Sequence, residues 1–76
     1  MSPEEKLTRS MTTLLRLYGA TLPQCMMILV PLIETGTMPE MADWLLGQYD
    51  RGKQPGIQSI ISRMLEITGS KEVLNN

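Results

Sequence analysis

The chain has 76 residues and a formal net charge of −1, with no histidine and a single cysteine, Cys25. Its length limits it to one domain, expected to span residues 1–76, and its dispersed, balanced charges leave no strong electrostatic footprint for nucleic acid or anionic lipid. The lone cysteine excludes an intrachain disulfide, and without histidine or a cysteine pair we expect no metal site.

The first predicted helix covers residues 3–18. Ser2 and Glu5 have the spacing of a capping box, and Pro3 occupies the first helical position, where its missing N–H costs nothing. Apolar residues then recur at helical spacing on one face. They are Leu7, Met11, Leu14, Leu15 and Tyr18. Gly19 is expected to end this helix.

The second predicted helix covers residues 22–35, and Thr21 and Gln24 form a second capping box. Residues 25–30 are apolar in every direction around the helix axis, which is typical of a helix buried on all sides. A strand is the alternative for so short an apolar run, but the capping box argues against it. Pro31 predicts a kink, or a helix that ends and restarts. Gly36 closes the segment.

The third predicted helix covers residues 38–49, after a third capping box from Thr37 to Glu40. Its apolar face contains Met38, Met41, Ala42, Leu45 and Tyr49. Trp44 lies roughly 120° from the centre of that face, at 100° per residue. A loop follows up to Gly56.

The fourth predicted helix covers residues 56–68, where Ile57, Ile60, Ile61, Met64 and Leu65 repeat the helical spacing. Gly69 is expected to end it, and residues 70–76 then form either one more turn or a frayed tail. The fold class that follows is all-α: a compact bundle of four short helices that dimerises.

Catalysis fits this composition poorly, because histidine, the commonest general base, is missing. Cys25 is the obvious nucleophile, but its apolar neighbours favour an unreactive, buried thiol. The carboxylates are typical of helix starts and solvent-facing positions, and the glycines form no phosphate-binding motif. We therefore expect no catalytic residues and no cofactor. The acidic N-terminus and the short apolar runs predict a cytoplasmic protein without a secretory signal or a membrane span.

A helix-turn-helix DNA-binding regulator, built from residues 37–68, is the alternative function. Its second helix would present polar side chains to base edges, and the preceding loop would supply cations to the phosphates. These candidates are Gln58, Ser59, Ser62 and Arg63 on the helix, with Arg51 and Lys53 in the loop. The long connection, and the four basic against five acidic residues in 37–76, disfavour nucleic acid as the partner.

The favoured function is a small regulatory or adaptor module that binds protein. Seven methionines suit adaptable surfaces as well as irregular cores. A bundle this small can hardly enclose the second helix, so part of it is exposed unless another chain covers it. The predicted interface consists of Met26, Met27, Val30, Pro31 and Trp44. We expect a homo-oligomer, most simply a two-fold dimer, that also binds a further protein partner.

Overall fold

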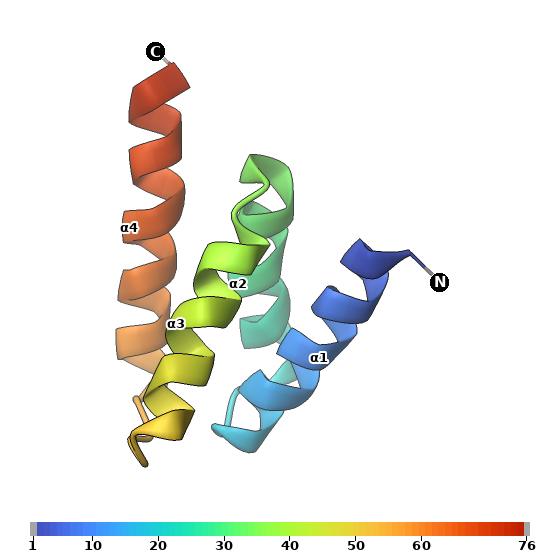
Figure 1. Cartoon of the computed structure of the whole chain (residues 1–76), viewed down its shortest axis with the longest axis vertical. Coiled ribbons are helices and arrows are strands. Elements are labelled where there is room, and N and C mark those ends of the chain that lie inside the picture. Colours follow the sequence, from blue (N-terminus) through green and yellow to red (C-terminus); the bar gives the residue numbers. More distant parts are fainter. Residues whose placement is uncertain (1, 76) are drawn as a thin grey trace.

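The computed structural model describes the backbone of residues 2–75 and the side chains of residues 2–69. It contains four α-helices and, between residues 2 and 75, no strand, which confirms the all-α prediction. The helices are α1 (Pro3–Leu17), α2 (Leu22–Thr35), α3 (Met38–Asp50) and α4 (Ile57–Asn75). Figure 1 shows α2 and α3 between α1 and α4, and each of these two central helices contacts both outer ones.

The first two helices begin as the sequence predicts. The Ser2 hydroxyl accepts a hydrogen bond from the Glu5 backbone N–H at 3.2 Å. At the start of α2 the capping box is complete: Thr21 Oγ1 accepts from the Gln24 N–H at 3.3 Å, and Gln24 Oε1 accepts from the Thr21 N–H at 2.9 Å. These side chains satisfy backbone donors that would otherwise lack partners in the first turn.

The third predicted capping box is wrong. Thr37 precedes α3 with φ −105° and ψ 13°, rather than in the extended conformation of a side-chain cap, and its hydroxyl makes no capping bond. That hydroxyl instead shares a 2.7 Å hydrogen bond with Thr35 Oγ1. The connection between α2 and α3 is so short that Thr37 still belongs to the end of α2, where its N–H donates to Leu32 O. This position keeps Thr37 out of the capping conformation.

Pro31 does not interrupt α2, which is one continuous helix from Leu22 to Thr35. The alternative of a helix that ends and restarts is therefore wrong, while a kink stays a prediction. The helix ends instead at Gly36, whose φ of 67° is the left-handed conformation of a C-terminal cap. The Thr35 hydroxyl donates to Pro31 O at 2.9 Å in this last turn.

The fourth helix is longer than predicted. Gly69 does not end it, and the backbone stays helical to Asn75 rather than forming a frayed tail from residue 70. Gly69 is not among the glycines with positive φ, so it occupies an ordinary helical position. A glycine inside a helix costs only about 1 kcal/mol relative to alanine, which the neighbouring residues can offset.

The core lies where the four helices meet. Its buried members include Met11 and Leu15 of α1, the inner side of α2, and Ile60 and Met64 of α4. Most predicted apolar faces point inward, but Tyr49 and Leu65 are exceptions, with 66% and 59% of their surface exposed. Between residues 2 and 75, no helix is both long and apolar enough to cross a membrane.

Candidate protein interaction surface

The second helix is buried on one side only. Cys25, Ile28, Leu29 and Leu32 form its buried side, which packs into the core. The opposite side exposes large apolar side chains whose accessible fractions range from 44% to 65%. These five residues, which we call the α2 stripe, are Leu22, Met26, Met27, Val30 and Ile33. A single chain therefore leaves much of α2 uncovered, as the sequence predicts for a bundle of this size.

The α2 stripe runs the length of the helix. Leu22, Met26 and Ile33 are spaced i, i+4 and i+11, which places them on one face. Val30 and Met27 extend that face to one side, and Pro31, which the sequence also predicts for the interface, is half-buried beyond them. Glu34 is the only charged residue of α2. The five stripe residues are uncharged, and the exposed Glu34 carboxylate lies beside them in the last turn, four residues after Val30.

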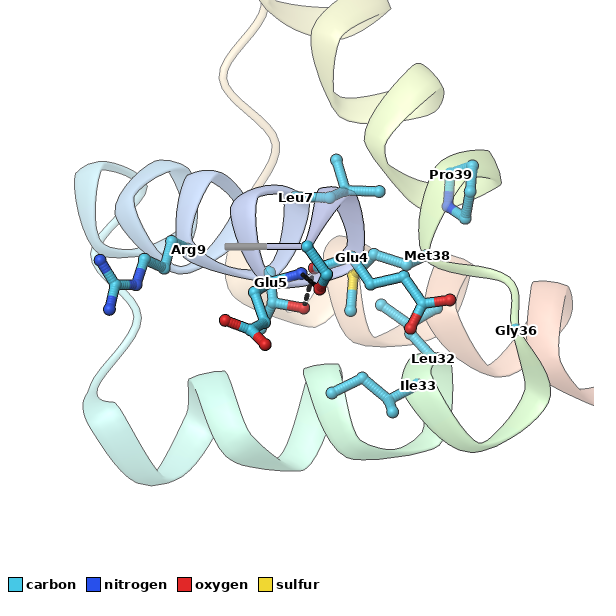
Figure 2. A pocket seen from close by; sticks show the side chains of 11 residues that line it. Glu4, Glu5, Leu7, Arg9, Leu32, Ile33, Gly36, Met38 and Pro39 are labelled. Carbon is cyan, nitrogen blue, oxygen red and sulfur yellow. Dashed lines mark hydrogen bonds between the residues drawn. The ribbon is translucent and has the colours of Figure 1, made fainter.

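A groove continues from the C-terminal end of the α2 stripe. It has a volume of about 600 Å³, and Figure 2 shows the side chains that line it. It lies between the N-terminal half of α1 and the C-terminal half of α2, two segments that diverge in Figure 1. Leu7, Leu32 and Met38 contribute its apolar lining, and Ile33 belongs to both the groove and the stripe. Glu4, Glu5 and Arg9 line it from α1. The apolar surface of this end is therefore edged by charge.

A second, smaller groove of about 230 Å³ lies between α1 and the end of α3. It contains Leu14, Leu17, Tyr18 and Tyr49 and no residue of α2. Leu17 is the most exposed large apolar side chain of residues 2–69, at 72%. The buried Tyr18 hydroxyl has no hydrogen-bond partner among those residues. This groove is a second apolar surface, separate from the α2 stripe.

Trp44 is half-buried at the contact between α3 and α4. The guanidinium of Arg63 lies 5.2 Å from the centre of its ring, within cation–π range. Arg63 also lies 3.4 Å from a Glu66 carboxylate oxygen. Because Arg63 covers one ring face, Trp44 offers less free surface for a partner than its position in the sequence predicts.

The candidate DNA contacts lie on and before the first turns of α4. Arg51 and Lys53 are exposed in the 51–56 loop. Gln58, Ser59 and Ser62 are exposed on α4, whereas Arg63 is held between Trp44 and Glu66. The most useful base-reading side chain of the set thus already has partners within the chain.

Cys25 is 2% exposed, in the inner side of α2. A nucleophile must reach its substrate, so this thiol can act only if α2 leaves the core. Among the described residues, no group of three or more acidic or cysteine side chains is placed to hold a metal ion.

Sequence reasoning missed parts of the exposed apolar surface. Leu22 and Ile33 extend the stripe at both ends. They are eleven residues apart and Met26 follows Leu22 by four, so the sequence alone already indicates that the three share one helix face. Leu17 gave no such signal, because it is a single residue outside the apolar face of α1. A comparison of the chain with known protein families, with curated protein sequences and with solved structures finds no match.

Proposed function

We propose that this protein is a non-enzymatic helical module that acts by binding protein, and that it self-associates through the α2 stripe. The observation that supports the proposal is the α2 stripe, an exposed apolar surface along the length of the helix beside which Glu34 is the only charged residue of α2. Contiguous apolar surface of this kind usually marks an interface, because its exposure to water is unfavourable. A regulatory or adaptor role, with a further protein as partner, is the function class that we propose.

A second copy of the chain is the occupant that the stripe fits best. Its surface is apolar, and the flexible side chains of Met26 and Met27 can adapt to an identical surface across a two-fold axis. Full burial of one such side chain contributes roughly 1.5–3 kcal/mol. The stripe residues of both copies together contribute more than the cost of association, and we expect a dissociation constant on the order of micromolar, which corresponds to a surplus of about 8 kcal/mol.

The decisive experiment replaces Met26, near the middle of the stripe, with glutamate. Burying a carboxylate in an apolar interface is so unfavourable that we expect Met26→Glu to weaken self-association roughly a hundredfold or more. Leu17→Glu is the matched control, because it also places a carboxylate at an exposed apolar position but lies in the groove that contains no residue of α2. Sedimentation equilibrium measures both variants, and circular dichroism checks that both stay helical.

Three results would overturn the proposal. The unmodified chain could remain a monomer at high micromolar concentration. Met26→Glu could leave the association constant unchanged. Leu17→Glu could dissociate the oligomer while Met26→Glu does not, which would move the interface to the groove between α1 and α3.

DNA binding is the second candidate function. The exposure of Gln58, Ser59 and Ser62 on one face of α4, next to Arg51 and Lys53, is the observation that favours it. A gel shift with a random-sequence duplex at low and moderate salt tests it, since phosphate contacts give salt-dependent affinity. No shift at low salt would eliminate this candidate.

A further inference from the structure

The bundle is polarised in charge along α2. One end contains the start of α1, the end of α2 and the start of α3, and the other end contains the opposite termini with the 51–56 loop (Figure 1). The first end carries Glu4, Glu5, Glu34 and Glu40 against Lys6 and Arg9. The second end carries Arg16, Arg51 and Lys53 against Asp50. The first end is therefore acidic and the second basic, and the α2 stripe connects them.

The α2 helix has the same polarity within itself. Its first turn contains no acidic residue, whereas the first turns of α1 and α3 contain Glu4, Glu5 and Glu40. Its single charge, Glu34, lies in its last turn, where the partial negative charge of the helix disfavours a carboxylate. A carboxylate would be stabilised at the other end of an identical helix, beside the partially positive first turn.

From these observations we propose that two copies pair antiparallel along the α2 stripe, so that the acidic end of each copy lies beside the basic end of the other. The inference rests on the proposed self-association and adds the orientation of the partner. The two-fold axis passes near residue 28, midway between Leu22 and Glu34. Met26 of one copy then lies opposite Val30 of the second copy, and Glu34 lies opposite the first turn of its α2.

Arg16 is the basic residue best placed to meet Glu34 of the second copy. Its guanidinium donates to Ala20 O at 3.3 Å, directly before the Thr21 cap of α2. Arg16 also follows Glu5 and Arg9 at i+11 and i+7, so it lies on the face of α1 that borders the groove. Both copies contribute this contact, which gives two Arg16–Glu34 pairs per dimer. Parallel pairing would instead place like charges together at both ends.

Charge reversal tests the orientation. In an antiparallel dimer, Arg16→Glu and Glu34→Arg each create two repulsive contacts, and we expect either change to weaken association roughly tenfold. The double variant restores two attractive pairs and returns the dissociation constant to within about threefold of that of the unmodified chain. Asp43→Arg, with the same charge change on the exposed side of α3, is the matched control and should alter the constant less than twofold.

A crosslinking measurement on the same dimer keeps the inference testable if a reversal unfolds the chain. Arg16→Cys and Glu34→Cys proteins are treated with a short bismaleimide, with Cys25 left in place because it is buried. Antiparallel pairing gives a crosslinked dimer when the two proteins are mixed and little when each is alone. Efficient crosslinking of each protein alone would show parallel pairing and overturn the inference.

The outcomes separate the two proposals. If the double charge-reversal variant associates no more tightly than the single variants, only the orientation is overturned. If the unmodified chain is a monomer, the proposed function is overturned as well.

Discussion

The helices α1 and α2 begin alike and are nearly equal in length, yet they differ in how much apolar surface they expose to water. Each follows a hydroxyl cap and a proline in its first turn. In α1 the apolar residues occupy one face, and the rest of the surface is mostly polar and exposed. In α2 both faces are apolar, but only one is buried. The core contains one apolar face of each of these two helices, and the second apolar face of α2 lies outside it.

The largest effects should separate the two faces of α2. Leu32 is fully buried, so Leu32→Ala should lower the free energy of unfolding by about 2–5 kcal/mol, as should Leu15→Ala in α1. Met26→Ala removes an exposed side chain and should cost less than about 0.5 kcal/mol in the monomer. Urea denaturation measures the free energy of unfolding of all three variants, at a protein concentration below the dissociation constant of the dimer. An equal cost for Met26→Ala would mean that the outer face of α2 also supports the fold.

A smaller effect is expected where α2 ends. Gly36→Ala would force a side chain into a left-handed conformation, at a cost of about 1–2 kcal/mol, although there is open space around the position. Gly69→Ala is the matched control, because Gly69 lies in an ordinary helical position with no atom near an added Cβ. That control should raise the free energy of unfolding by about 0.5–1 kcal/mol. Thermal unfolding measures both variants. A stabilised Gly36→Ala protein and a destabilised Gly69→Ala protein would contradict the conformations assigned to these two glycines.

The smallest effect concerns the helix starts. Thr21→Ala removes the complete capping box of α2 and should cost about 1 kcal/mol. Ser2→Ala removes a single 3.2 Å bond, whereas the box at Thr21 has two, and should cost less. Chemical denaturation with both variants compares the two caps. A larger loss for Ser2→Ala would show that the start of α1 is held more firmly than that of α2.

Most of the fold could be predicted because its signals are local. Caps at Ser2 and Thr21 and the glycine at position 36 act within a few residues, and they define α1 and α2. The third cap and the end at Gly69 were predicted wrongly because other interactions compete there. Thr37 is held by the end of α2, and the residues after Gly69 continue the helix at little cost.

The site was less predictable than the fold. The sequence indicates that α2 has more apolar surface than the bundle can cover, but it does not say which side faces the core. That choice depends on how α1, α3 and α4 pack, and so does the groove between α1 and α2, whose lining comes from distant parts of the chain. Trp44 illustrates the same point, since only the folded chain places Arg63 over its ring.

The burial of Cys25 makes its thiol a probe of how often α2 separates from the core. Its sulfur lies in the inner side of α2, so a soluble thiol reagent can reach it only when that helix separates from its neighbours. The rate of thiol modification therefore reports how often α2 opens. If a second copy clamps the outer side of the same helix, raising the protein concentration will slow that rate, and association becomes visible without any label on the surface.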